Sequence, residues 1–241
     1  MPKFLAVCGA PGVGKTVTAL KLAQEINGST AKRTLFFSPD LTVPLLGFLF
    51  PHCKADDLYS VGETFDRTEI VCEDVLRQIV TVKAMQDFGY LGFKAGETRY
   101  SYPAPTEDKI RQFFACLRQL ADYVVVDCVS DADDLISSMA RSEADTVLYT
   151  VHPDLKSIAY DLSHEEMFAG CADRLIHVMN CGEKDMYLPM DDVKKHFKTV
   201  EHTLPYSFAL HKQSYTGTLA EHLTDPKYRA AMQRLAKAVT V

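Results

Sequence analysis

The chain has 241 residues, of which 47% are hydrophobic, and it carries a formal net charge of −6. This length supports one sizeable hydrophobic core, and because no Pro-, Gly- or Ser-rich linker divides residues 1–241, we expect a single domain. The negative charge argues against a protein that mainly binds nucleic acid, so no specific nucleic-acid partner is predicted.

Cysteine usage and the apolar runs indicate the compartment. The seven cysteines form no C-x-x-C pair and no zinc-ligand spacing, which is typical of a reducing cytosol. The apolar start of the chain is too short for a secretory signal, and the run from Val43 to Phe50 is far shorter than the ~18 residues that cross a bilayer. We therefore expect a soluble cytoplasmic protein.

Residues 9–16 read GAPGVGKT, a complete G-x-x-x-x-G-K-[ST] phosphate-binding loop. The apolar run Phe4–Cys8 precedes it, and a helical pattern with a stop at Asn27-Gly28 follows it, which is the context that the motif requires. Backbone N–H groups of such a loop surround phosphate oxygens, while the lysine reaches the terminal phosphates and the last hydroxyl binds Mg²⁺. We therefore predict nucleoside triphosphate binding. The residues assigned to the loop site are Gly9, Ala10, Pro11, Gly12, Val13, Gly14, Lys15, Thr16 and Val17.

Further along the chain, apolar runs without polar alternation indicate strands buried on both faces of a sheet. These runs lie at 34–37, 90–93, 123–126, 147–149 and 175–179. Helical patterns lie between and after them, at 70–86, 106–121, 131–142, 154–169, 189–197 and 226–238. The alternation predicts a doubly wound three-layer α/β/α sandwich with a mainly parallel sheet, in which ligands bind at the carboxyl ends of the strands. Residues 51–105 are the hardest to interpret, and we expect partner contacts there.

Polar residues at the predicted strand ends complete the candidate site. Asp127 ends an apolar strand, where its carboxylate is suited to hold Mg²⁺. Asp40 follows the second strand and is predicted either to orient the attacking water or a Mg²⁺-bound water, or to cap a helix that starts at Leu41. Asn180 is predicted either to read a purine base through its amide or to serve as a turn residue with a left-handed backbone.

These markers, in this order, resemble the MinD/ParA family of dimeric P-loop ATPases, and within it the TadZ/CpaE branch that helps to assemble pili. The matching segments are 33–41, 122–127, 144–151, 177–180 and 203–206. The resemblance implies ATP/ADP and Mg²⁺ as cofactors, with Thr16 and Asp127 at the metal. Asp40 would position water, and Asn180 and the Pro205 backbone would border adenine. The resemblance also implies a nucleotide-dependent homodimer that switches its affinity for a protein partner of an assembly or positioning system.

Four departures from the family pattern bear on hydrolysis. The second loop lysine, which in the family reaches the partner's nucleotide, is Ala10 here. Val17 replaces a frequent threonine, Ser38 replaces the leading aspartate of the first switch, and the second switch at 127–131 lacks its Pro and Gly. Because a charge that acts on the transition state is worth several powers of ten in rate, we predict tight nucleotide binding with slow turnover.

Alternatives stay open for the biochemical function, for the identity of the nucleotide base and for contact with a membrane. One is a nucleotide-binding scaffold without hydrolysis, and another is a small-molecule P-loop kinase, for which the loop at 94–105 offers only Lys94 and Arg99. ATP is favoured over GTP because no N-K-x-D motif follows the last long strand, although Glu183 does not exclude guanine. The last helix has a basic and an apolar side, so membrane contact is open, but packing on the domain is favoured.

Overall fold

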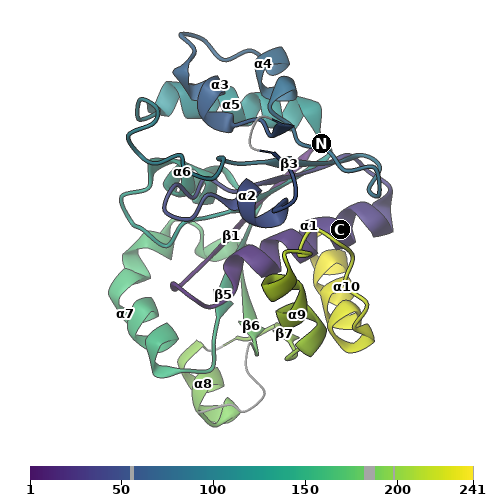
Figure 1. Cartoon of the computed structure of the whole chain (residues 1–241). Helices are drawn as coiled ribbons and strands as arrows, with labels where there is room; N and C mark the ends of the chain where they lie inside the picture. The colour runs from purple at the N-terminus through teal and green to yellow at the C-terminus, as the bar shows by residue number, and fades with distance from the viewer. Residues whose placement is uncertain (55–56, 182–187, 198, 241) are drawn as a thin grey trace.

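The computed structural model describes residues 1–54, 57–181, 188–197 and 199–240 (Figure 1). At its centre lies a seven-stranded sheet with the order β3-β2-β4-β1-β5-β6-β7, and every pairing between these strands is parallel. The strands are β1 (Lys3–Gly9), β2 (Thr34–Phe37), β3 (Phe88–Leu91), β4 (Tyr123–Asp127), β5 (Thr146–Val151), β6 (Leu175–Asn180) and β7 (His202–Leu204).

Helices cover both faces of the sheet, which confirms the predicted doubly wound three-layer α/β/α sandwich (Figure 1). In the described chain they are α1 (Lys15–Thr30), α2 (Leu45–Leu49), α3 (Val61–Asp66), α4 (Cys72–Arg77), α5 (Glu107–Leu120), α6 (Leu135–Glu143), α7 (Leu155–Ala169), α8 (Met190–Phe197), α9 (Phe208–Thr216) and α10 (Pro226–Thr240). Among the described residues, no helix is both long and apolar enough to span a membrane.

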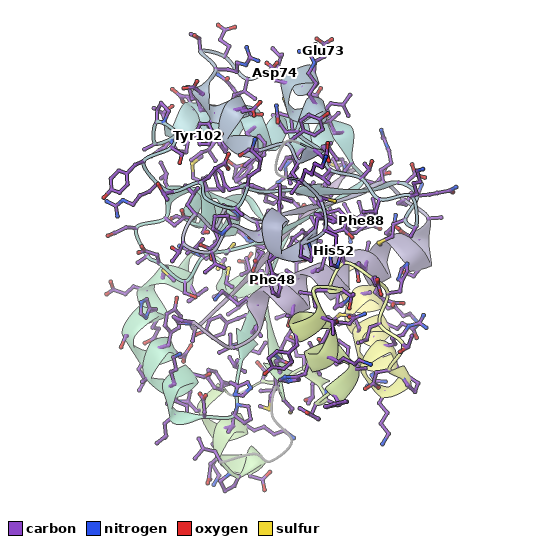
Figure 2. The ribbon with its side chains drawn as sticks, viewed as in Figure 1. Phe48, His52, Glu73, Asp74, Phe88 and Tyr102 are labelled. Carbon is purple, nitrogen blue, oxygen red and sulfur yellow. The ribbon has the colours of Figure 1, made fainter. Side chains whose placement is uncertain are left out.

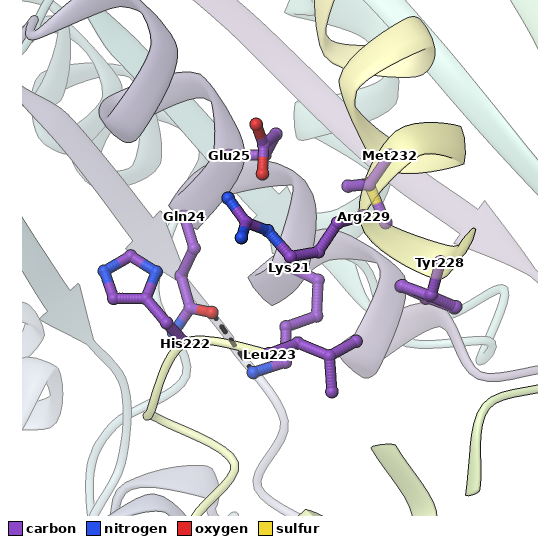
Figure 3. Close-up of a pocket in the computed structure, with 8 residues that line it drawn as sticks. All are labelled: Lys21, Gln24, Glu25, His222, Leu223, Tyr228, Arg229 and Met232. Carbon is purple, nitrogen blue, oxygen red and sulfur yellow. Dashed lines mark hydrogen bonds between the residues drawn. The ribbon is translucent and has the colours of Figure 1, made fainter. Parts of the chain in front are cut away.

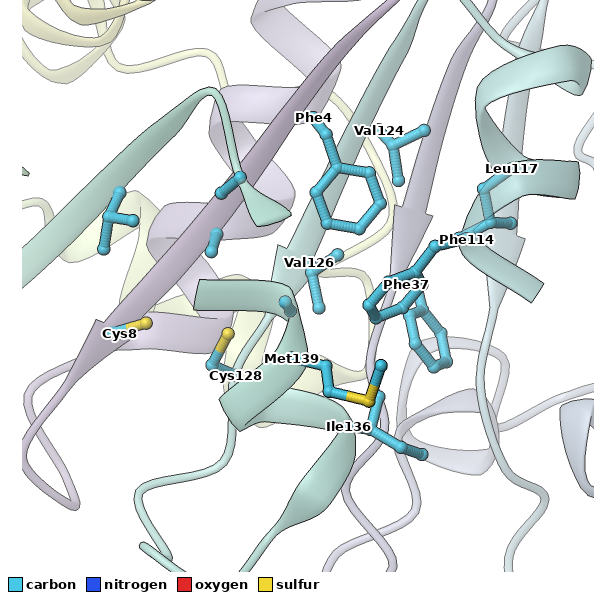
Figure 4. Packing of buried hydrophobic residues seen from close by; sticks show 14 of the residues in the cluster. Phe4, Cys8, Phe37, Phe114, Leu117, Val124, Val126, Cys128, Ile136 and Met139 are labelled. Atoms are coloured by element: carbon cyan, nitrogen blue, oxygen red, sulfur yellow. The ribbon is translucent and has the colours of Figure 1, made fainter. Parts of the chain in front are cut away.

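Strand β1 explains how the two core layers form. Its alternate side chains Phe4 and Cys8 join the layer that α5 and α6 cover, as Figure 4 shows, whereas Leu5 and Val7 join the layer beneath α1 and α10. The Phe4 ring packs against Phe114 of α5 with centroids 4.9 Å apart. A strand that is apolar on both faces is thus held at the centre of the sheet, with β4 on one side and β5 on the other.

The chain winds outward from β1 in both directions, so the strand order reverses at this point. Doubly wound sheets open a crevice where the order reverses, outside the carboxyl ends of the strands. Val7 pairs with Asp127 of β4, and Gly9 pairs with Thr150 of β5. The phosphate-binding loop therefore leaves the sheet at the crevice.

Three predicted helix boundaries were wrong. The helix expected over 70–86 ends at Arg77, because Val80 turns back and exchanges two backbone hydrogen bonds, of 2.9 and 2.8 Å, with Tyr90. The helix expected from residue 131 begins at Leu135, where Asp134 caps it by accepting from the Ser137 N–H at 2.7 Å. Helix α1 also continues beyond its expected stop at Asn27-Gly28 as far as Thr30.

Residues 51–105 were the hardest to interpret, and their described part contains α3, α4 and the edge strand β3. Helix α4 carries Glu73 and Asp74 in its first turn, at the tip of the molecule in Figure 2. The loop that follows β3 is anchored by Glu97, whose carboxylate accepts hydrogen bonds from Ser60 at 2.6 Å and from Tyr102 at 2.7 Å. These hydrogen bonds hold the loop against the start of α3.

The C-terminal helix packs on the domain. The side chains on its apolar side, those of Tyr228, Met232, Leu235 and Val239, are all buried. Next to this contact, the buried ammonium of Lys21 donates to the carbonyls of Leu219 and Glu221, both at 2.7 Å. It also donates to the side chain of Gln24 at 3.2 Å, a hydrogen bond that Figure 3 shows. These hydrogen bonds join α1 to the loop between α9 and α10.

Candidate nucleotide-binding site

The phosphate-binding loop joins β1 to α1 through three glycines with positive φ. These angles are 144° at Gly9, 84° at Gly12 and 82° at Gly14. A Cβ atom on Gly9 would lie 2.2 Å from the carbonyl oxygen of Thr150, and a Cβ atom on Gly14 would lie 2.3 Å from the amide nitrogen of Asn180. Backbone conformation and close packing both require glycine at these two positions.

Helix α1 presents an uncapped N-terminus to the loop. Its N-cap is Gly14, no side chain caps it, and its first turn contains no acidic residue. The first N–H groups of a helix have no intrahelical acceptor, and the helix dipole adds partial positive charge at this end. The arrangement fits an anion held by the backbone, as the loop motif predicts.

Lys15 folds back over its own loop. Its ammonium donates to the Ala10 carbonyl at 3.1 Å and to the hydroxyl of Ser130, which in turn donates to the Gly9 carbonyl at 3.0 Å. Burial lowers the pKa of Lys15, whereas the negative charge of Asp127 raises it. The lysine thus stands beside both the loop and the carboxylate at the end of β4.

Asp127 is a buried carboxylate, and one of its two oxygens has no hydrogen-bond partner among the described residues. Its side chain is 3% exposed, and Oδ2 accepts a hydrogen bond from the Ser38 hydroxyl at 3.2 Å. Oδ1 is buried and accepts no hydrogen bond among the described residues. Burial raises the pKa of Asp127 to about 6, against the opposing effects of the Thr16 hydroxyl and the Lys15 ammonium. Such an orphaned oxygen fits a cation ligand.

Asp40 lies in the loop after β2, close enough to the site for its charge to raise the pKa of both Lys15 and Asp127. Its Oδ1 accepts the backbone N–H groups of Thr42 at 2.7 Å and Val43 at 3.0 Å. The alternative that it caps a helix starting at Leu41 was wrong, because the next helix begins at Leu45 after Pro44. Asp40 instead stabilises a turn in the loop that follows β2.

Asn180 ends β6 and reaches the phosphate-binding loop. Its amide nitrogen donates to the Val13 carbonyl at 2.9 Å. The alternative of a left-handed turn residue was wrong, because Asn180 lies in the strand and has no positive φ. Gly182 and Glu183, on which the choice between ATP and GTP partly depended, lie outside the described residues.

A cleft of about 260 Å³ lies beside the loop and collects predicted residues from distant parts of the chain. Gly12, Gly14 and Val17 line it from the loop and α1, and Asn180 and Pro205 line it from the far side. Ser38 and Ser130 are further site residues that sequence reasoning did not assign, although each stands next to the end of a strand, where polar residues are informative.

Comparison with known proteins identifies the fold. No protein-family model matches the sequence, and no curated protein matches it. Among solved structures, the chain is similar to MinD from Pyrococcus horikoshii OT3 complexed with Mg-ADP (TM-score 0.71, 15% identity, covering 100% of this chain and 96% of that chain). It is also similar to a ParA family ATPase from Chlorobium tepidum TLS, with a TM-score of 0.73, 13% identity and coverage of 98% of each chain. A third similar structure is the MinC:MinD cell division protein complex from Aquifex aeolicus, with a TM-score of 0.70, 16% identity and coverage of 98% of this chain and 95% of that chain.

The chain therefore has the fold of the MinD and ParA ATPases, over almost its whole length. This confirms the resemblance inferred from the sequence at the level of fold. The narrower likeness to the TadZ/CpaE branch stays a prediction.

Proposed function

We propose that this protein is a Mg²⁺-dependent, ATP-binding P-loop ATPase that acts as a nucleotide-dependent switch. The observation that carries the proposal is the convergence of three features at one edge of the sheet. They are the uncapped helix start at Gly14, the Lys15 ammonium and the orphaned buried oxygen of Asp127. Together they offer backbone donors and a cation for phosphate, and an oxygen ligand for a hard metal ion.

The residues present fit Mg²⁺. Thr16 and Asp127 would hold the ion, and bound Mg²⁺ would neutralise charge on the phosphate oxygens. No cluster of three or more His, Cys, Asp or Glu in the described chain could hold a metal by itself, so phosphate oxygens and waters must supply the remaining ligands. Magnesium typically binds through one or two protein groups plus phosphates, which agrees with this site.

Two chain features support ATP as the nucleotide. Asn180 and Pro205 line the cleft beside the loop, as expected of residues that border adenine. Asn180 is held in place by its hydrogen bond to Val13, so its orientation is fixed before a base arrives. The neighbours solved with Mg-ADP and in a MinC:MinD complex support a nucleotide-driven switch with a protein partner.

Hydrolysis is proposed to be slow. Asp40 would orient the attacking water, and its turn with Thr42 and Val43 keeps the carboxylate near the loop. Position 10 is alanine, so the charge that the family delivers from a partner chain is absent. Dimerisation over nucleotide and a role in assembling pili or a secretion apparatus extend the proposal, on the strength of the sequence resemblance alone.

The kinase alternative is disfavoured by the contacts of its two candidate cations. Lys94 pairs with Glu63 at 3.7 Å, and the guanidinium of Arg99 lies over the Tyr100 ring at 5.3 Å from its centroid. The scaffold alternative differs from the switch only in turnover. Single-turnover hydrolysis distinguishes the scaffold from the switch.

Calorimetric titration with Mg·ATP and Mg·GTP tests the binding proposal. We expect ATP to bind more tightly than GTP, and Lys15→Ala to lose most of the affinity. Lys32→Gln, which removes a lysine at an exposed position, is the matched control and should bind like the wild type. Absence of heat with both nucleotides in millimolar excess would refute nucleotide binding.

Single-turnover hydrolysis with Asp40→Asn separates the slow switch from the scaffold. Asparagine keeps an Oδ1 acceptor for the Thr42 and Val43 N–H groups but removes the charge. We expect a rate about 100-fold lower with unchanged ATP affinity, the scale of a lost general-base contribution. A wild-type protein that binds ATP but releases no phosphate would support the scaffold instead.

A further inference from the structure

Lys156 lies beside the phosphate-binding loop, although it belongs to a different element. It is the second residue of α7, the helix that follows β5. Its ammonium nitrogen lies 3.5 Å from the position that a Cβ atom would take on Gly12. Both Lys156 and Gly12 are exposed. Within the described residues, no hydrogen bond or ion pair engages this ammonium.

The location of Lys156 is unfavourable for a lysine that has only a structural role. It stands in the first turn of α7, where the helix dipole places partial positive charge and disfavours a cation. The nearest acidic residue in sequence, Asp154, is occupied: it accepts the Ser157 N–H at 2.7 Å and lies 3.5 Å from the His152 ring. The positive charge of Lys156 at the start of α7 is thus electrostatically unfavourable, and no nearby negative charge offsets it among the described residues. Unfavourable local features of this kind are typical of functional sites.

The loop itself is short of positive groups for a polyphosphate. Pro11 has no N–H to donate, and position 10 is an alanine. Lys15 is the one lysine within the loop, and its ammonium already contacts the Ala10 carbonyl and Ser130. A second cation beside Gly12 would approach the loop at a different residue from Lys15 and would share the charge of the phosphates.

We propose that Lys156 is the second phosphate-binding cation of this site, supplied by α7 of the same chain that holds the nucleotide. The inference rests on the proposed nucleotide binding. It assigns to this chain a charge from within the subunit, whereas the lysine that the family pattern places at position 10, and that would reach a partner's nucleotide, is Ala10 here. Because Lys156 and Gly12 belong to one chain, the contact does not depend on dimerisation.

The test compares the affinities of Lys156→Gln and the wild type for AMP, ADP and ATP, without Mg²⁺ and by calorimetry. We expect Lys156→Gln to weaken ATP binding about tenfold, the size of one charge-assisted hydrogen bond near the surface. ADP should lose less and AMP almost nothing, because the effect acts through the outer phosphates. Lys156→Arg should recover most of the ATP affinity.

Two controls separate this role from a structural one. Lys237→Gln removes an exposed lysine of α10 and should leave all three affinities unchanged. The melting temperature of nucleotide-free Lys156→Gln should equal that of the wild type, because the ammonium of Lys156 makes no hydrogen bond or ion pair in the described part of the chain.

Each failure has a distinct reading. If the wild type binds ATP and Lys15→Ala does not, but Lys156→Gln binds like the wild type, the inference is overturned and the proposed function stands. If the wild type binds no nucleotide, both are overturned. A loss that appears only at protein concentrations where the chain dimerises would place the ammonium on a partner's nucleotide and would also overturn the proposal.

Discussion

Single side chains set the shape of the loop more tightly than the motif alone suggests. Gly14 combines a φ of 82° with an amide nitrogen of Asn180 that lies 2.3 Å from any added Cβ. The carbonyl of Val13, one residue earlier, accepts the hydrogen bond of that same amide at 2.9 Å. The end of β6 therefore supports the loop directly, and the two parts of the site depend on each other.

Gly14→Ala tests this dependence. The left-handed backbone alone should cost about 2 kcal/mol, and the displaced Asn180 amide should also reduce ATP affinity. Gly28→Ala is the matched control, because Gly28 is helical, exposed and has no atom within 4 Å of an added Cβ. It should raise stability by about 0.5–1 kcal/mol. Urea unfolding and ATP titration of both variants measure the difference, and equal behaviour of the two would contradict the packing argument.

At this scale the sequence named many of the residues that the structure brings to one edge, but not all of them. Lys15 was found because the phosphate-binding motif fixes its position, and Asp127 was found because it ends an apolar run. Ser130 was missed because its contact with Gly9 spans 121 residues and exists only through the pairing of β1 with β4. Lys156 was missed for a similar reason, since nothing in a helical pattern reports which loop lies next to it.

At the scale of elements, long strands and helices were predictable and short ones were not. The strand at Thr34–Phe37 was predicted to the residue because it is apolar throughout. Helices α2 and α3 have five and six residues, too few for a helical period to stand out. Helix α1 outran its predicted stop because Asn27 turns its amide to the carbonyls of Lys32, Gln86 and Asp87. Of these partners, Gln86 and Asp87 lie about 60 residues further along the chain and are brought to Asn27 only by tertiary structure.

The hydrogen bonds of Lys21 in α1 to the loop between α9 and α10 predict that the stability of the protein depends on pH. Burial lowers the pKa of Lys21 to about 7 from its ordinary value of 10.5. Between these values the unfolded chain holds a proton that the folded protein releases, so stability contributed by this lysine rises as pH increases from about 7 towards 10.5. Below pH 7 the contribution stays at its lowest level.

Lys21→Met removes this dependence. At pH 7 we expect a loss of about 1–3 kcal/mol, because the buried carbonyls of Leu219 and Glu221 lose their donor. The gap to the wild type should then widen by up to about 1.4 kcal/mol per pH unit above pH 7. Urea midpoints at pH 7, 8 and 9 measure it, with Lys32→Met at an exposed position as the control. Parallel pH profiles of Lys21→Met and the wild type would rule the account out.

For the whole molecule, ligand binding should appear as global stabilisation, because the site draws on β1, β4, β6 and α1 together. At an ATP concentration of 100 times the dissociation constant, binding adds about 2.7 kcal/mol to the stability. For a chain of this size that corresponds to a rise in melting temperature of roughly 5 to 11 °C. Differential scanning fluorimetry with and without Mg·ATP measures the shift.

Asp127→Asn gives the matched comparison for the metal. It should keep a shift with ATP alone but lose the additional shift that Mg²⁺ brings, since the amide is a poorer ligand than the carboxylate. An identical response to Mg²⁺ in the variant and the wild type would remove Asp127 from the metal site.

The central position of β1 also has a consequence for biosynthesis. Lys3 pairs with Tyr123, and Gly9 with Thr150, so β1 acquires both of its neighbours only after β2 and β3 have been translated. At roughly 5–20 residues per second, the 120 residues from Lys3 to Tyr123 take about 6 to 24 s to synthesise. During that interval β1, which is apolar from Phe4 to Cys8, lacks both of its partner strands. The phosphate-binding loop, which leaves the end of β1, therefore takes its place in the sheet only once β5 has been translated.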